Sequence, residues 1–380
     1  MYALPYLIFL SLLFFLYLNE TGKIKFISRK AAVITAFICA LFFIGLRGHV
    51  MCDFIIYYEY FKSLPALDSI IKHNQYAYYG FEPGFVIYSS IIKTLFGNYF
   101  VWVAINAAID LIVLFITFKR FCNSTILPFI FFFIFQGYTI EFNLMRNAKS
   151  IDLFLLSLPY LQNRKFLKYT CLNLLGTLFH SSAFLYIPFY FLLTRTISTW
   201  VIGFGIIISN LLFLLKLPFV NVLISNIHFI QIIGVYDKLV GYASSGVEFG
   251  ISFGYIERTI TMILFCMFRK KLAASNPFNI ILFNSYWFYY VSFLFFYEIT
   301  VFVERIPLLF VFSYWMLYPN LIALHTKYRQ LVIALVAMLA IARATIGFNN
   351  KTMTYSNVLF STPDYEDARE MQLDEMRNGK

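Results

Sequence analysis

Charged residues are scarce in this chain. They make up 13% of its 380 residues, whereas 61% are hydrophobic and the mean hydropathy is +0.74. A soluble domain carries roughly a quarter charged residues, and no soluble core of this size could bury so much apolar surface. Apolar runs near the ~20 residues that a spanning helix needs recur along the whole chain. The sequence therefore predicts an all-α polytopic membrane protein.

Several chemical signatures are also missing. No two of the five cysteines lie close in sequence, so the spacing of a metal or redox site is absent. The chain has no Gly-rich phosphate loop, which argues against a nucleotide substrate. No adjacent pair of acids opens the first long loop, as a metal-dependent lipid-linked glycosyltransferase would tend to require. We therefore expect neither a metal nor a cofactor.

The apolar runs predict about twelve transmembrane helices. They are expected near residues 2–18, 31–46, 98–118, 125–140, 147–161, 169–180, 182–194, 199–215, 255–268, 279–297, 306–323 and 330–343. Residues 83–97 form one further apolar run, but its length, Lys93 and the Pro83-Gly84 start favour a re-entrant or surface half-helix. Such irregular backbone at membrane depth is tolerated inside protein or beside a wet cavity.

Basic residues set the predicted orientation. The net charge is +11, but the positive side chains are spread over short loops, which favours membrane insertion over nucleic-acid binding. Alternate short loops carry Lys23, Lys25, Arg29, Lys30, Lys119, Arg120, Arg164, Lys165, Lys168, Arg195, Arg269, Lys270, Lys271, Lys327 and Arg329. The positive-inside rule places these loops in the cytoplasm. We predict a single transmembrane domain over 1–343 with external loops 47–97 and 216–254, and a polar external tail over 344–380.

Arg47 is the first candidate site residue that this topology places outside. It lies between Gly45 and Gly48 at the end of an apolar run, and Asp53 and Tyr57 follow on the same loop. One interpretation is an arginine that anchors to lipid headgroups. The other is a guanidinium fork that grips a diphosphate. Asp53 could be a partner of the arginine, a base or a metal ligand.

Arg146 is a second candidate and lies in a polar stretch between two apolar helices. Lys149 is three residues on and would share a helix face with it. The structural alternative is a salt bridge from Arg146 to Glu141 or Asp152. The functional alternative is an anion site at the external surface.

The remaining candidates are His180, Arg258 and Arg305. His180 could shuttle protons near neutral pH, or it could be a satisfied polar residue at a helix end. Arg305 follows Glu304 and Arg258 follows Glu257, so each arginine could simply pair with its neighbour. If they instead face one external cleft with Arg47 and Arg146, they would form a cationic site for a diphosphate.

These segments resemble the EpsG-like branch of the Wzy-type polysaccharide polymerases, which serve O-antigen and capsule synthesis. The resemblance rests on Gly45-Leu46-Arg47-Gly48 with Asp53 and Tyr57, on Asn143-Leu144-Met145-Arg146-Asn147, on Arg164 to Tyr169 leading to Leu178-Phe179-His180-Ser181-Ser182-Ala183, and on Arg305-Ile306-Pro307-Leu308 with Tyr318-Pro319. Together they cover residues 31–325.

The resemblance implies a GT-C-like polymerase architecture and a nucleotide-independent glycosyltransferase. A growing glycan would move from polyprenyl diphosphate onto a new lipid-linked repeat, on the outer face of the bacterial inner membrane. Arg47, Arg146, His180 and Asp53 would be catalytic. The substrate would be bound by Arg305, Arg258, Lys149 and Tyr57.

The implied partners are an undecaprenyl-diphosphate-linked oligosaccharide, the lipid bilayer, a chain-length regulator and a flippase, with no nucleic acid. Two other functions stay open at this point. One is an O-antigen ligase-like or lipid-donor glycosyltransferase, which would share the donor chemistry. The other is a flippase or transporter for lipid-linked sugars, although such a protein should carry charges in the middle of several helices.

Overall fold

The structure is a computed structural model that describes residues 2–226 and 250–378. These residues form helices, turns and isolated β-bridges, and no strand occurs among them. The chain divides into two compact units. Unit 1 comprises Met1–Tyr190 and Tyr328–Lys380, and unit 2 comprises Phe191–Lys327. The all-helical prediction is therefore confirmed for the described residues, and each unit is presented by itself below.

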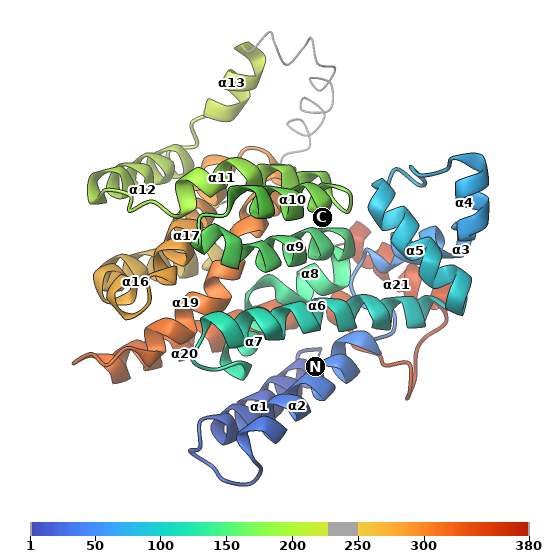
Figure 1. Cartoon of the computed structure of the whole chain (residues 1–380), viewed down its shortest axis with the longest axis horizontal. Coiled ribbons are helices and arrows are strands. Elements are labelled where there is room, and N and C mark those ends of the chain that lie inside the picture. Colours follow the sequence, from blue (N-terminus) through green and yellow to red (C-terminus); the bar gives the residue numbers. More distant parts are fainter. Residues whose placement is uncertain (1, 227–249, 379–380) are drawn as a thin grey trace. The chain divides into compact units, whose positions relative to one another are not determined.

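Unit 1 contains most of the long apolar helices (Figure 1). In chain order its long segments are α1 (Leu4–Glu20), α2 (Arg29–Ala40) with the π-helix η1 (Leu41–Gly45), α6 (Tyr99–Phe121), α7 (Ile126–Phe132) with η2 (Phe133–Gly137) and α8 (Tyr138–Asn143), α9 (Met145–Gln162), α10 (Phe166–Thr177), the 3-10 helix η3 (Ser181–Leu185) with α11 (Tyr186–Leu193), and α20 (Arg329–Phe348).

Within residues 2–226 and 250–378, three helical stretches are long and apolar enough to cross a membrane, namely Tyr99–Phe121, Ile126–Asn143 and Arg329–Phe348. The second of these bends at Gln136, whose φ is 69°. Other segments are shorter: α10 has 12 residues, which span about 18 Å at 1.5 Å per residue, whereas the hydrocarbon core is about 30 Å thick. The structure thus supports a helical membrane protein, and the number of twelve crossings stays a prediction.

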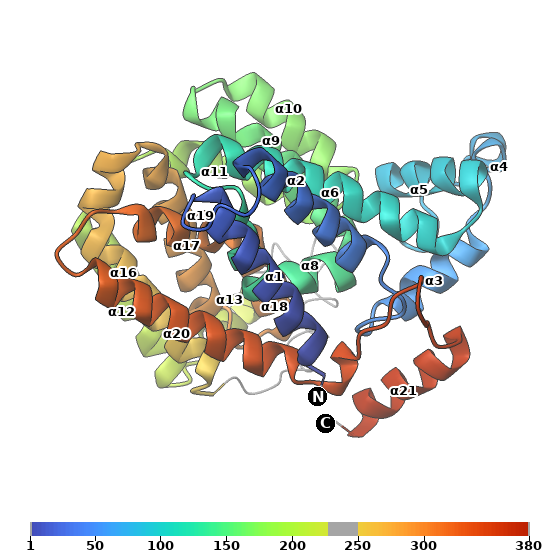
Figure 2. The ribbon, with the colours of Figure 1, turned by 90° about the horizontal axis from the view of Figure 1, so that it is seen from below.

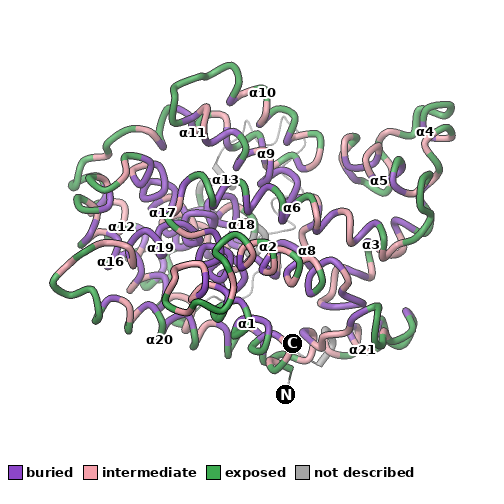
Figure 3. The backbone as a smooth tube through the Cα atoms, turned by 60° about the horizontal axis from the view of Figure 1, so that its bottom comes forward, coloured by how far each residue is buried: buried purple, intermediate pink, exposed green. Residues whose placement is uncertain are grey.

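Helix α9 lies at the centre of unit 1. It packs against α6, α8 and α10, and buried residues follow it along most of its length, whereas α20 is largely exposed (Figure 3). A helix that is buried on most sides normally carries few charges. The polar residues at the start of α9 are therefore exceptions to this pattern, and their contacts must explain why they are there.

The first external loop and the C-terminal tail fold together. The loop forms α3 (Phe54–Ser63), α4 (Leu67–His73) and α5 (Pro83–Phe96), and α5 is the expected half-helix of 14 residues. The tail forms the short 3-10 helix η5 (Lys351–Met353) and α21 (Tyr365–Asn378), which lies beside α3 (Figure 2). The rings of Tyr58 and Tyr365 stack there at 4.1 Å. The tail is therefore part of the folded unit.

Unit 2 is built around α17 (Phe278–Phe295), which packs against α12 (Thr199–Leu214), α16 (Phe253–Ser275) and α19 (Phe312–Ala323). Its shorter elements are α13 (Phe219–Asn226), α18 (Thr300–Arg305) and η4 (Pro307–Phe310). Of the predicted external loop 216–254, residues 227–249 lie outside the described part of the chain. The prediction of one transmembrane domain over 1–343 stays a prediction.

Candidate active site

The first candidate site residue in unit 1 is the arginine at the start of α9. Arg146 is the second residue of α9, and its Nη1 lies 2.6 Å from Oε2 of Glu82. Its guanidinium lies over the ring of Phe81, with Cζ 4.0 Å from the ring centroid. Its Nε is buried, and no acceptor among the described residues reaches it. Arg146 is thus held in place but keeps donor capacity. Neither Glu141 nor Asp152, the partners considered from the sequence, makes this bond.

Glu82 connects Arg146 to a second helix start. It is the N-cap residue of α5, and its Oε1 accepts a hydrogen bond of 3.1 Å from the main-chain N–H of Ser181, the first residue of η3. The starts of α5, α9 and η3 therefore meet around one carboxylate and one guanidinium. The start of a helix carries a partial positive charge and unpaired N–H groups, so this position is suited to anions.

A glycine makes this convergence possible. The N–H of Gly84 donates to the main-chain oxygen of Leu178 at 2.8 Å, which joins the first turn of α5 to the end of α10. A Cβ atom at position 84 would lie 2.8 Å from both Cβ and the main-chain oxygen of Leu178. Real Cβ atoms do not approach other atoms this closely, so only glycine fits here without a shift of the backbone.

His180 lies beside this pair and its orientation is fixed. Its Nδ1 accepts a hydrogen bond of 3.2 Å from the N–H of Ser182 and lies 2.7 Å from the Ser182 hydroxyl. That hydroxyl also lies 3.4 Å from Oδ1 of Asn147 on α9. Because Nδ1 accepts from a main-chain N–H, a neutral His180 carries its proton on Nε2. This assignment follows from the hydrogen-bond geometry.

Tyr57 also reaches Arg146, as the sequence suggested for a substrate-binding residue. Burial raises the pKa of Tyr57 to about 12, and the nearby Arg146 opposes this shift. The hydroxyl is therefore protonated at neutral pH. Asp53 lies one helical turn earlier, before α3, and its main-chain N–H donates to Oδ1 of Asn143 at 3.3 Å.

Arg47 is placed differently. Only 5% of its surface is exposed, and its two terminal nitrogens each donate at 2.7 Å to main-chain oxygens, those of Ile44 and Glu141. Its guanidinium also lies 4.8 Å from the ring centroid of Phe142. The contacts fasten the end of η1 to α8. They fit a structural anchor more closely than a free diphosphate fork, and the clamp role of Arg47 stays a prediction.

Lys149 is buried as well. Its ammonium group forms an ion pair with Asp110 on α6 and donates to the main-chain oxygen of Asn106 at 2.9 Å. It shares helix α9 with Arg146, as the sequence indicated. However, its charge is compensated inside the protein, so these contacts do not present Lys149 to a substrate.

Arg258 and Arg305 belong to unit 2. Arg258 is buried in α16, where Nε donates to the Tyr289 hydroxyl at 2.7 Å and Cζ lies 4.0 Å from the centroid of the Phe293 ring. Arg305 ends α18 and is exposed. The side chain of Glu304, its expected partner, lies outside the described residues. Their gathering with Arg146 in one cleft stays a prediction.

Glu82 was not among the site residues expected from the sequence. The signal was present, because an acid stands directly before Pro83-Gly84, and proline at the first helical position marks a helix start. An acid at such a start either caps its own helix or points elsewhere. The long-range contact to Arg146, 64 residues away, could not be read from local sequence.

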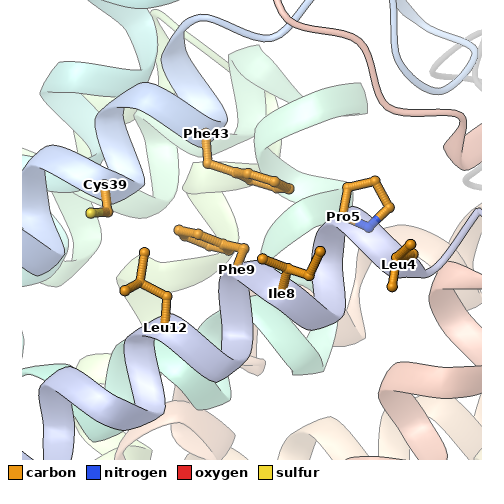
Figure 4. A pocket seen from close by; sticks show the side chains of 7 residues that line it. All are labelled: Leu4, Pro5, Ile8, Phe9, Leu12, Cys39 and Phe43. Carbon is orange, nitrogen blue, oxygen red and sulfur yellow. The ribbon is translucent and has the colours of Figure 1, made fainter.

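A separate pocket of about 360 Å³ lies between α1 and α2 with η1 (Figure 4). Apolar side chains and one thiol line it, namely Leu4, Pro5, Ile8, Phe9, Leu12, Cys39 and Phe43. It brings no acid, base or cation together and therefore is no candidate for the chemical step. Among the described residues, no group of three or more His, Cys, Asp or Glu could hold a metal ion.

Comparison with known proteins gives one finding. The family model described as the EpsG family matches residues 30–357, which is most of the chain and includes Glu82, Arg146 and His180. No curated protein and no solved structure matches the chain.

Proposed function

The chain belongs to the EpsG family, which makes it a polysaccharide-polymerase type of membrane protein, and from this premise we propose the reaction that it catalyses. The protein moves a growing glycan from polyprenyl diphosphate onto a new lipid-linked repeat unit. A hydroxyl group of the new repeat attacks the anomeric carbon, a glycosidic bond forms, and polyprenyl diphosphate leaves. The donor carries its own leaving group, so no nucleotide is consumed. This agrees with the lack of a Gly-rich phosphate loop in the sequence.

The observation that carries the proposal is the position of Arg146. Negative charge develops on the diphosphate as the glycosidic carbon–oxygen bond breaks, and a fixed guanidinium stabilises that charge. Arg146 is oriented by Phe81 and Tyr57, keeps an unpaired buried Nε, and lies at the start of α9. Arginine can also grip two phosphate oxygens at once, which a lysine cannot do in the same geometry.

Neighbouring groups complete the site. His180 lies beside Arg146, and its ring is oriented by the Ser182 N–H, which donates to Nδ1. The positive-inside orientation puts the site on the outer face of the plasma membrane, where lipid-linked repeats meet. Arg47 supports the site indirectly by holding η1 against α8, the helix that precedes α9.

The deciding experiment is a polymerisation assay with purified protein in proteoliposomes and a polyprenyl-diphosphate-linked oligosaccharide. Wild-type protein should yield products of two and more repeats. Arg146→Ala should abolish them, and Arg146→Lys should leave a small fraction, because the charge remains but the fork is lost. Arg120→Ala is the matched control, since Arg120 is exposed and also lies near an aromatic ring.

Three distinct outcomes would contradict the proposal. Normal ladders from both Arg146 variants, at normal protein levels, would remove the arginine from the mechanism. Transfer of a single finished chain to another acceptor, without any ladder, would identify a ligase-like enzyme. Movement of the lipid-linked repeat across the bilayer without new glycosidic bonds would identify a flippase.

A further inference from the structure

Glu82 is the one carboxylate in direct contact with Arg146 among the described residues, and we propose that it is the general base of the transfer reaction. This inference rests on the proposed function and assigns a residue that it leaves open. Glu82 would take the proton from the acceptor hydroxyl while Arg146 stabilises the departing diphosphate. The acid would then act on the incoming hydroxyl and the arginine on the departing diphosphate of the same reacting carbon.

The geometry fits a base that is partly accessible. Each carboxylate oxygen of Glu82 accepts one hydrogen bond, from Arg146 at 2.6 Å and from the Ser181 N–H at 3.1 Å. An ionised carboxylate can accept about four such bonds, so each oxygen keeps room for a further donor. The side chain is 19% exposed, and a hydroxyl group can approach it from that side.

His180 is a poorer base in this arrangement. Its Nδ1 lone pair already accepts the Ser182 N–H, and a neutral ring then carries the proton on Nε2. A ring in this state can donate a hydrogen bond but has no free lone pair for the hydroxyl proton. Asp53 precedes α3, and it is Tyr57, one turn later, that reaches Arg146. Glu82 thus takes, in this proposal, the role that the sequence left open between His180 and Asp53.

The step balances without any further reactant. The acceptor O–H bond breaks, and its proton moves to an oxygen of Glu82. The acceptor oxygen bonds to the anomeric carbon, and the bond from that carbon to the diphosphate oxygen breaks with its electron pair on the diphosphate. The proton then passes from Glu82 to water, which restores the carboxylate.

A purely structural role for Glu82 is the competing explanation, because this chain caps helix starts with glutamates elsewhere. Glu20 accepts from Thr125 N–H at 2.7 Å at the start of α7, and Glu298 accepts from Val220 N–H at 2.8 Å at the start of α13. Glu82 differs from both, because its carboxylate also forms an ion pair with Arg146. Glu20→Gln is therefore the matched control, since it alters a capping carboxylate away from the site.

The test combines four variants in the proteoliposome assay. Glu82→Gln keeps an oxygen that can accept the Ser181 N–H, and it should lower the polymerisation rate at saturating substrate by about a hundredfold or more, the usual contribution of a general base. Glu82→Asp should retain part of the rate. Glu82→Ala should be inactive, and added formate should restore activity. Glu20→Gln should polymerise at the wild-type rate.

Two measurements distinguish a general base at position 82 from a residue that only caps a helix start. Wild-type polymerisation should decline at acidic pH as the base becomes protonated, and this acid limb should vanish in the residual activity of Glu82→Gln. Binding of inorganic pyrophosphate should persist in Glu82→Gln and be lost in Arg146→Ala. A wild-type rate in Glu82→Gln, or no formate rescue of folded Glu82→Ala, would overturn the assignment. Absence of polymerisation by the wild-type protein would instead refute the proposed function.

Discussion

The ammonium group of Lys149 on α9 forms an ion pair with the carboxylate of Asp110 on α6, and both side chains are about 95% buried. Arg146 lies on the same helix, only three residues earlier, and is 20% exposed. Helix α9 thus places Arg146 at the candidate site, whereas Lys149 on the same helix holds it against α6. Both cations lie on the same helix, so their place in the sequence does not distinguish the site residue from the structural one. Only their surroundings in the folded unit do.

Removal of one partner of the Lys149–Asp110 pair should destabilise unit 1 strongly. Lys149→Met leaves Asp110 buried without its cation, and breaking a buried pair costs about 3–5 kcal/mol. We expect a large fall in the thermal midpoint of the detergent-solubilised protein and low levels in membranes. The double variant Lys149→Met with Asp110→Leu should recover much of the loss. A single variant as stable as wild type would show that the pair is dispensable.

Replacement of Arg47 should lower the stability of the protein more than its affinity for a diphosphate. Arg47→Ala leaves the main-chain oxygens of Ile44 and Glu141 without their donors, and an unsatisfied buried group costs about 1–3 kcal/mol. We expect a lower thermal midpoint but nearly unchanged affinity of the folded protein for inorganic pyrophosphate. A selective loss of pyrophosphate binding with an unchanged midpoint would instead support the diphosphate clamp.

Much of the fold could be predicted from the sequence because hydrophobic runs determine helices locally. The segments expected at 98–118 and 330–343 are α6 and α20, with ends that differ by a few residues. The half-helix 83–97 is α5, since Pro83 starts it and Gly97, with a φ of 63°, ends it. The number of crossings could not be settled in this way, because helices such as α10 are shorter than the bilayer.

The candidate site was predictable only in part. Arg146, His180 and Tyr57 do come together. Arg146 and His180 stood out as polar residues beside apolar sequence, whereas Tyr57 was expected from the family resemblance. Glu82 and the burial of Arg47 depend on contacts between segments far apart in the chain. Local patterns carry no information on which of several arginines meets a distant acid, so packing decides this.

His49 should make the attachment of the tail sensitive to acid. Its ring lies in an aromatic cluster, 4.7 Å from the Phe54 ring and 5.8 Å from the Tyr365 ring. Burial lowers its pKa to about 4, from an ordinary value of 6.5, against the opposing effect of Asp364. Between pH 4 and pH 6.5 the imidazole of His49 therefore binds a proton more readily in the unfolded protein than in the folded one. Stability is present above pH 6.5 and falls as the pH drops toward 4.

The measurement is amide hydrogen exchange in residues 365–378 at pH 7.5 and pH 5, corrected for the intrinsic pH dependence of exchange. Protection of α21 should fall at pH 5 in the wild-type protein, and His49→Phe should remove most of that fall. The loss is at most about 3 kcal/mol, given 1.36 kcal/mol per pKa unit. Equal protection at both pH values would show that the imidazole does not hold the tail.

The predicted orientation can be tested with two exposed residues, Gln75 in the first external loop and Lys25 after α1. In a background with the five native cysteines replaced, a membrane-impermeant maleimide should label Gln75→Cys in intact spheroplasts and should label Lys25→Cys only after permeabilisation. The positive-inside rule gives this order. Labelling of both from the same side would contradict the external site.

Gly84 provides the sharpest structural test of the site. Gly84→Ala would place a methyl group 2.8 Å from the main-chain oxygen of Leu178, so the start of α5 must move away from the end of α10. Glu82 lies two residues earlier and would move with it, away from Ser181 and Arg146. We expect a destabilisation of about 1–3 kcal/mol, typical of overpacking, and a larger proportional loss of polymerisation rate.

Gly203→Ala on α12 is the matched control, because nothing lies within 4 Å of the added methyl group and alanine favours the helix by up to about 1 kcal/mol. Full activity of Gly84→Ala would show that the three helix starts need not meet at this distance for catalysis.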